Sequence, residues 1–240
     1  MQIGVQLIVW GERNRTDRAG VLAEVAQAGF DAVEMGPQQD GAQADEELKR
    51  NGLRVVASHA STGSLERDLD GHLRWLERHG ARLLACSGSD YPTSAQYRDV
   101  ARRLDRAGAR CREQGVSLCY HNHAHEITHD MFGLSHILAE TDPANVKLNI
   151  DTFWVARGGQ DPATVIRLLR GRAGYLHLKD MLADGSFGEI GQGKLDWAGI
   201  RAAADAVGIT VAVVEQDRTT GTPLHSSTLS RSYLREHWGA

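Results

Sequence analysis

The segment VKLNIDTFWVARGGQDPATVIRLLRGRAGYLHLKD, residues 146–180, contains one complete strand–helix–strand unit. Val146–Asp151 and Tyr175–Leu178 are short apolar runs, which are typical of strands buried on both faces. Between them, Ala163–Leu169 has the spacing of an amphipathic helix. The side chains that close the two strands are ionisable. The segment therefore predicts a parallel βαβ unit with polar groups at the carboxyl ends of its strands.

The same alternation runs along the whole chain. The eight expected strands are Ile3–Ile8, Ala32–Met35, Arg54–Ser58, Arg82–Cys86, Ser117–His121, Val146–Asp151, Tyr175–Leu178 and Thr210–Glu215. The expected helices are Arg18–Ala28, Leu65–Arg78, Ala95–Gln114, Phe132–Glu140, Ala163–Leu169, Trp197–Ala206 and Ser226–His237. Eight units in 240 residues favour a (β/α)₈ TIM barrel, α/β in class, as a single domain over 1–240. An open doubly wound sheet is the alternative, but residues 10–13 after the first strand form no glycine-rich loop.

Composition excludes several other classes of protein. The 27 Lys and Arg are outnumbered by 31 Asp and Glu, and no basic stretch predicts a nucleic-acid partner. No apolar run approaches the roughly 18 residues of a membrane helix, so we expect no membrane partner. Three cysteines with no CxxC spacing fit a reducing compartment. We therefore expect a cytoplasmic protein.

Ionisable residues stand at the ends of six expected strands. They are Glu34, His59, the segment 120–126, Asp151, His177 with Lys179 and Asp180, and Glu215 with Asp217. A barrel carries its active site at this end of its strands, and carboxylates with imidazoles suit a divalent cation. Asp151, His177 and Glu215 come from three consecutive strands and can reach one ion. Each alone has a simpler explanation, as a helix cap or a core residue; three together favour a metal site.

The segment YHNHAHE, Tyr120–Glu126, follows the fifth strand. Strand alternation would turn His121 and His123 to the same side, with Cys119 below them. An inward His121 could move a proton beside a metal ion. The alternative is a histidine cluster on a surface loop, which we prefer for His125 and His129.

Five stretches carry a resemblance to a known family: YHNHAHE at 120–126, NIDTFWVARGGQDP at 149–162, HLKD at 177–180, GEIGQGKLDW at 188–197 and VVEQD at 213–217. In this order, they resemble the sugar phosphate isomerase/epimerase superfamily, the xylose-isomerase-like barrels. The match is to the subgroup whose fifth strand reads Tyr-His-Asn-His, and it covers essentially the whole chain. The resemblance implies a TIM barrel enzyme acting on a small sugar or polyol.

The resemblance also implies one divalent metal ion, Mn²⁺ first, with Co²⁺, Mg²⁺ or Zn²⁺ as alternatives. Family ligands map onto Asp151, His177 and Glu215. The fifth-strand ligand departs from the pattern, because Cys119 stands where many relatives have a glutamate. We expect Glu126 to complete the shell, with His121, His123 or Cys119 as alternatives.

By the same resemblance, the reaction is proton abstraction next to a carbonyl in an isomerase or epimerase. Glu215 and either Glu126 or His121 would exchange the proton, and Lys179 would bind hydroxyls or an oxyanion. Expected substrate-binding residues are His59, His123, Trp154 and Trp10. The alternative reaction is β-elimination by a dehydratase or lyase, on a keto-inositol or a 3-keto sugar.

Four further points stay open from the sequence. Relatives are often homodimers, so a homodimer is an open expectation beside a monomer. An abasic-site endonuclease would need more metal ligands and a less acidic balance. A barrel that has lost its metal and only binds sugar is the remaining alternative, and the Cys119 departure keeps it open. No phosphate-binding motif is evident, so we expect an unphosphorylated substrate. The glycine-rich segment 188–193 keeps a phosphorylated substrate open as the alternative.

Overall fold

The expected strands form a closed parallel barrel. A computed structural model describes residues 1–39 and 43–239. Within them the strand order around the barrel is β1-β10-β7-β6-β5-β4-β3-β2, closing on itself. The barrel strands are β1 (Gln2–Gln6), β2 (Ala32–Glu34), β3 (Arg54–Ser61), β4 (Leu83–Ser87), β5 (Ser117–His121), β6 (Val146–Asp151), β7 (Ala173–Leu178) and β10 (Val211–Val214). The predicted (β/α)₈ architecture is confirmed.

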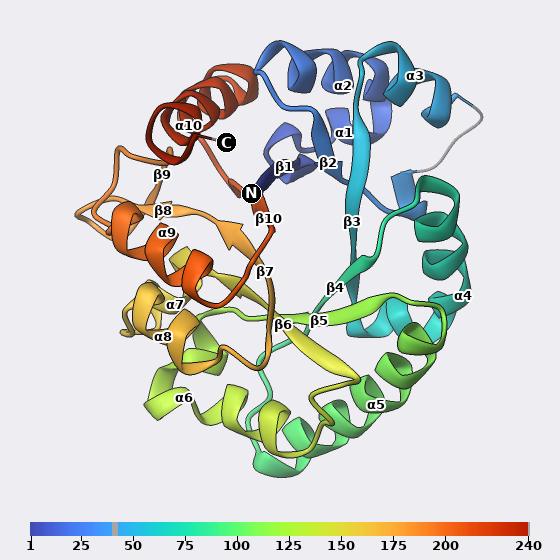
Figure 1. Ribbon diagram of the computed structural model, residues 1–240, viewed down its shortest axis with the longest axis vertical. Helices are drawn as coiled ribbons and strands as arrows, with labels where there is room; N and C mark the ends of the chain where they lie inside the picture. The colour runs from blue at the N-terminus through green and yellow to red at the C-terminus, as the bar shows by residue number, and fades with distance from the viewer. Residues whose placement is uncertain (40–42, 240) are drawn as a thin grey trace.

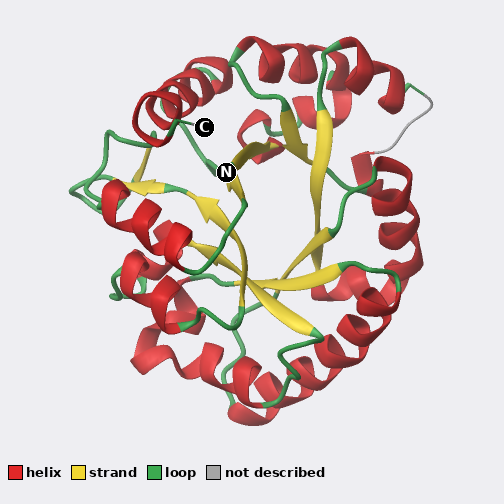
Figure 2. Cartoon of the chain, in the orientation of Figure 1, coloured by secondary structure: helices red, strands yellow, loops and turns green. Residues whose placement is uncertain are grey.

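Helices surround the barrel as an outer ring, with the strands at the centre (Figures 1 and 2). They are α1 (Arg13–Thr16), α2 (Arg18–Gln27), α3 (Ala44–Arg50), α4 (Thr62–His79), α5 (Ser94–Glu113), α6 (Ala124–Ala139), α7 (Thr152–Arg157), α8 (Pro162–Leu168), α9 (Trp197–Ala206) and α10 (Pro223–Trp238), with the 3₁₀ turns η1 (Leu7–Trp10) and η2 (Pro37–Gln39). No helix in the described ranges is both long and apolar enough to span a bilayer.

The hydrophobic core has two parts. Most buried apolar side chains lie between the strands and the ring of helices. A smaller cluster of Ala32, Val56, Ala57, Ala85, Cys119, Tyr175 and Val213 packs separately. Strand alternation explains the division, because successive side chains face the helices and the barrel interior in turn. Cys119 and Tyr175 therefore lie in the layer beneath the carboxyl ends of the strands.

Three local expectations were wrong. The first strand ends at Gln6, and residues 7–10 form η1, which the Gln6 side chain caps by accepting from Ile8 N–H. The helix expected over Phe132–Glu140 is the second part of α6, which begins at Ala124 and is interrupted at residues 128–131. His123 lies beyond the end of β5, so strand alternation does not orient it.

A short hairpin was not expected. After β7 the chain forms β8 (Asp180–Met181) and β9 (Phe187–Gly188), which pair antiparallel beside α9 (Figure 1). Together with α7 and the segment after β10, this hairpin lines a cleft.

Candidate active site

Four buried side chains meet where four neighbouring strands end. His121 closes β5, Asp151 closes β6, His177 lies near the end of β7, and Glu215 follows β10. One ligand atom from each lies within 4.8 Å of those of the others. Parallel register places Asp151 and His177 at one depth, since they are paired neighbours across β6 and β7. We call these four residues the His/carboxylate cluster.

The spacing between His121 and the two carboxylates of the cluster fits a cation. His121 Nε2 lies 3.6 Å from Asp151 Oδ2 and 3.5 Å from Glu215 Oε2. Nitrogen and oxygen ligands at bonds of about 2.1 Å in a tetrahedron are about 3.4 Å apart. Neither His121 Nε2 nor Asp151 Oδ2 makes a hydrogen bond within the described residues, although both are buried. Buried polar atoms normally have partners, and a divalent cation would supply one here.

The two oxygens of Asp151 have different partners. Oδ1 accepts from Trp154 N–H at 2.8 Å and so caps α7. Oδ2 faces His121 and Lys179, the latter at 3.3 Å. The helix-cap and metal-ligand interpretations of this residue are therefore compatible, because each uses a separate oxygen.

His177 is held from both sides by carboxylates. Its Nδ1 lies 2.6 Å from Glu215 Oε2, and its Nε2 lies 3.0 Å from Glu34 Oε2. Burial alone would lower the pKa of His177, but Glu34 and Glu215 raise it to about 10. Burial would likewise raise the pKa of Glu34, yet His177 and His59 hold it well below its ordinary value. The ring thus turns Nδ1 toward the cluster and Nε2 away from it.

Lys179 brings a buried positive charge to the cluster. Its Nζ lies 3.3 Å from Asp151 Oδ2 and 3.4 Å from Glu215 Oε2. It lies closer, at 2.6 Å, to Asp217 Oδ2. Burial would lower the pKa of Lys179, but the three carboxylates raise it above its ordinary value. The side chain is therefore an ammonium group near neutral pH, able to donate a proton or bind an oxygen but not to act as a base.

Glu126 lies outside the His/carboxylate cluster. Its Oε1 accepts from the Tyr120 hydroxyl at 2.6 Å and lies 2.9 Å from His125 Nε2, and its Oε2 accepts from His123 N–H at 2.7 Å. Both oxygens are thus occupied at the start of α6. Metal ligation by Glu126 stays a prediction that these hydrogen bonds disfavour.

The structure brings His121 to the position expected of Glu126. Burial would lower the pKa of His121, but Asp151 and Glu215 raise it. The alternative ligand Cys119 is buried one layer below, where burial raises the pKa of its thiol well above the ordinary value. A neutral thiol is a poor metal ligand, since the thiolate is the ligating form.

Of the expected substrate-binding residues, three surround the cluster. The ring of His59 lies 5.2 Å from that of His121, and the ring of His123 lies 4.9 Å from it on centroids. The ring of Trp154 lies 5.6 Å from that of His123. Trp10 instead packs in the hydrophobic core and donates its indole N–H to Glu24, a contact typical of a packing residue.

The glycine-rich stretch 188–193 wraps a side chain of the protein itself. The buried carboxylate of Asp180 accepts from five donors: the N–H groups of Met181, Gly191, Gly193 and Leu195, and the indole N–H of Trp197. A Cβ on Gly193 would lie 2.2 Å from Asp180 Oδ1, so only glycine permits this approach. These amides are therefore engaged within the protein.

A cleft of about 760 Å³ opens beside the cluster. It is lined by Phe153, Trp154, Arg157, Leu182, Asp184, Gly185, Ser186, Phe187, Glu189, Arg218, Thr219 and Thr220. Among them, Trp154 alone was expected from the sequence to contact the substrate. From the sequence, Asp217 and Glu34 were expected at strand ends without an assigned role. The structure shows that Asp217 contacts Lys179 and that Glu34 contacts His177. Their position at the end of a strand was the only sequence feature that could have indicated these contacts.

Known proteins resemble this chain over most of its length. The inosose dehydratase of Mesomycoplasma hyopneumoniae (strain 7448) is 25% identical over 210 residues, covering 75% of this chain and 70% of that protein. A sugar phosphate isomerase/epimerase structure from Parabacteroides distasonis aligns with a TM-score of 0.82 at 21% identity, over 98% of this chain and 94% of the other. A structure of the IolI protein with a bound zinc atom aligns at 0.77 and 14% identity, over 98% and 97%. A model of the xylose isomerase-like TIM barrel matches residues 22–236, and the chain belongs to that family.

Proposed function

We propose that this chain is a divalent-cation-dependent enzyme that removes a proton from the carbon next to a carbonyl of a sugar or cyclic polyol. The observation that carries the proposal is the His/carboxylate cluster, in which four potential ligand atoms converge and two of them, His121 Nε2 and Asp151 Oδ2, are buried without hydrogen bonds. The inosose dehydratases among its relatives, named for a keto-inositol substrate, support the same class.

We assign the cation to His121, Asp151, His177 and Glu215. Two imidazoles with two carboxylates suit Mn²⁺, Co²⁺ and Zn²⁺, and we retain Mn²⁺ as the first choice. When bound, the cation supplies charge stabilisation to the substrate oxygen on which negative charge develops, worth several kcal/mol. His177 would bind through Nδ1, because its Nε2 is engaged by Glu34.

The protein's own groups then complete a proton cycle. Glu215 takes the proton next to the carbonyl, and the electrons of the broken C–H bond form a carbon–carbon double bond. The carbon–oxygen bond of the β-hydroxyl breaks as the ammonium of Lys179 donates a proton to it, so that water leaves. Glu215 Oε2 and Lys179 Nζ lie 3.4 Å apart, close enough for the captured proton to return to the lysine.

From the sequence we expected isomerisation first, with elimination as the alternative. With the roles assigned above, we propose elimination first. Proton return to the opposite face of a sugar needs a second acid/base group. Glu126, one candidate, is engaged by Tyr120, His123 and His125, and His121, the other, stands among the metal ligands. A buried ammonium group beside the base suits the departure of a hydroxyl instead.

Isomerisation or epimerisation is the second candidate, and His123 favours it. Burial and the neighbouring His121 lower the pKa of His123 to about 4, so the ring is neutral near pH 7. A neutral imidazole beside His121 and Trp154 offers a second group for proton transfer.

The test combines product analysis with a metal measurement. Purified protein loaded with Mn²⁺ would be incubated with an inosose and with ketohexoses in D₂O. Elimination predicts a product that has lost one molecule of water; isomerisation predicts deuterium uptake without that loss. Asp151→Asn should lower bound metal and abolish turnover while the circular dichroism stays unchanged. Undiminished turnover by metal-free Asp151→Asn protein would refute the proposal.

A further inference from the structure

The cleft beside the cluster is built from the loops that carry the candidate catalytic groups. Phe153 and Trp154 follow Asp151 on α7, and Arg218–Thr220 follow Asp217. The β8–β9 hairpin, which supplies residue 182 and residues 184–187, follows Lys179. The cluster residues themselves do not line the cleft. Its volume of about 760 Å³ is therefore additional to the reaction site, and it lies in the upper part of the roughly 300–1,000 Å³ range of small-molecule sites.

Aromatic rings form the wall nearest the cluster. Lys179 Nζ lies 5.2 Å from the centre of the Trp154 ring and 5.6 Å from that of Phe187. The Phe153 and Phe187 rings pack with centres 4.3 Å apart, and Trp154 meets Phe187 nearly edge-on at 5.8 Å. Trp154 and Phe187 are half-buried. Their contact with the cleft gives a flat ligand ring a surface to stack on.

The charges of the cleft balance. Its ionisable lining residues are two arginines, Arg157 and Arg218, and two acids, Asp184 and Glu189. Arg157 donates to the carbonyl oxygen of Gly185 at 2.8 Å. A site for a phosphate or carboxylate would carry surplus positive charge, and this cleft carries none. Its occupant is therefore neutral.

Hydrogen bonds hold the cleft in shape. The contact between Arg157 and Gly185 ties the end of α7 to the hairpin tip. On the other side, Thr219 Oγ1 donates to Glu189 Oε1 at 3.1 Å. A cleft tied across both sides is preformed, which reduces the entropy cost of binding a ligand there.

From these features we infer that the substrate is a glycoside, with its reacting sugar at the cluster and a neutral, flat second ring stacked in the cleft. The second ring is an aromatic aglycone or a second sugar, since both present an apolar face. The inference rests on the proposed function for the reacting ring and adds the class of the second. With β-elimination, the leaving group would be the glycosidic alcohol if it lies β to the carbonyl, and otherwise a hydroxyl.

Binding of matched glycoside pairs tests the inference. Calorimetry on Mn²⁺-loaded protein would compare the p-nitrophenyl and methyl β-glycosides of glucose, galactose, mannose and xylose, with cellobiose added to separate a sugar ring from an aromatic ring. At least one p-nitrophenyl glycoside or cellobiose should bind about tenfold more tightly than its methyl partner, the gain expected for stacking one buried ring. Equal binding within every pair would overturn the inference.

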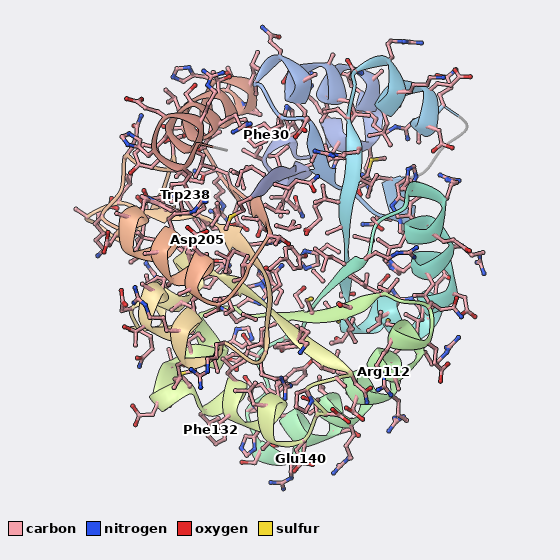
Figure 3. The ribbon with its side chains drawn as sticks, in the orientation of Figure 1. Phe30, Arg112, Phe132, Glu140, Asp205 and Trp238 are labelled. Atoms are coloured by element: carbon pink, nitrogen blue, oxygen red, sulfur yellow. The ribbon has the colours of Figure 1, made fainter. Side chains whose placement is uncertain are left out.

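Three variants locate the effect. Phe187→Ala should remove the gain and leave the methyl glycoside unchanged. Ser186→Trp fills the cleft from an exposed position and should do the same without a cavity. Phe132→Ala is the matched control, because Phe132 is a 39% exposed aromatic on α6 at the periphery of the barrel (Figure 3). A gain that survives both cleft variants contradicts the inference.

The design separates this inference from the proposed function. The ratio within a glycoside pair is a binding measurement, and Asp151→Asn should preserve it. A tenfold ratio in Mn²⁺-loaded unaltered protein that turns over none of the tested substrates would support the cleft and contradict the proposed chemistry. Confirmed turnover with equal affinities within every glycoside pair would support the proposed chemistry and contradict the role of the cleft.

Discussion

The Glu34 carboxylate should control how tightly the protein binds its cation, although it is not assigned as a ligand. Its Oε2 accepts from His177 Nε2 at 3.0 Å and from the Tyr175 hydroxyl at 2.7 Å, and its Oε1 lies 3.1 Å from His59 Nδ1. Glu34→Gln keeps the shape and can keep an acceptor for His177, but it removes the negative charge. The variant therefore isolates the charge that orients the His177 ring and strengthens Nδ1 as a ligand.

The expected loss follows from that contact. Groups that hold a metal-binding histidine typically contribute 10- to 100-fold in metal affinity. Since the His177–Glu34 hydrogen bond is fully buried, we expect Glu34→Gln to weaken Mn²⁺ and Zn²⁺ binding by at least about tenfold, or about 1.4 kcal/mol. Competition titration against a fluorescent chelator measures the change directly, without a substrate.

Two controls make the result specific. Glu47→Gln changes another buried glutamate, which lies on α3 and whose Oε2 is 2.6 Å from Arg18 Nε. This variant should leave metal affinity unchanged. Tyr175→Phe removes the other donor to the same Glu34 oxygen and should cost less than Glu34→Gln. Unaltered metal affinity in folded Glu34→Gln protein, or an equal loss in Glu47→Gln, would refute the reasoning.

Three more predictions concern stability and reactivity. Asp180→Ala leaves five hydrogen-bond donors without their acceptor. The free energy of unfolding, measured by urea denaturation, should fall by about 3 kcal/mol or more. A loss below about 1 kcal/mol would contradict the role given to this carboxylate. The three cysteines, Cys86, Cys111 and Cys119, are buried, and burial raises the pKa of each thiol. The native protein should therefore not react with a thiol reagent within minutes, whereas protein unfolded in urea should react at all three thiols. The folded pKa of His123 is about 4, so between about pH 6.5 and 4 the unfolded chain binds a proton that the folded chain does not. His123 therefore does not reduce the free energy of unfolding above about pH 6.5, and it reduces it increasingly as pH falls toward 4. In metal-free protein, His123→Gln should make the decline in melting temperature over that window shallower. If the variant and the unaltered protein decline equally, His123 is not the source of the pH dependence.

The barrel could be predicted because its strands are buried on both faces. Runs such as Val146–Asp151 are apolar enough to be recognised singly, and their regular alternation with helices implies a parallel sheet. The β8–β9 hairpin could not be predicted in this way. Each of its strands has two residues, too few for any periodic pattern, and its position depends on the burial of Asp180.

The cluster was predictable at three of its four positions for a related reason. Asp151, His177 and Glu215 are within or next to the ends of regular neighbouring strands, and these strand ends converge at one end of the barrel. Glu126 lies five residues past the end of β5, where the first turn of α6 decides its direction. A local signal existed: a glutamate three residues after the N-cap residue of a helix commonly accepts a hydrogen bond from that residue's N–H, as Glu126 does from His123. This bond engages Glu126 at the start of α6, and His121 is the residue that completes the cluster.

The glycine-rich segment 188–193 shows how one pattern can serve two kinds of anion. Backbone N–H groups freed by glycines bind phosphates in many enzymes, and the same groups bind a carboxylate equally well. Here the N–H groups of Gly191 and Gly193 donate to Asp180 at 2.9 and 3.0 Å, and a side chain on Gly193 would collide with that carboxylate. An external phosphate would have to displace a buried charge that anchors this whole loop, at a cost that such contacts would not recover. The motif therefore argues for a substrate without a phosphate, in agreement with the balanced charges of the neighbouring cleft.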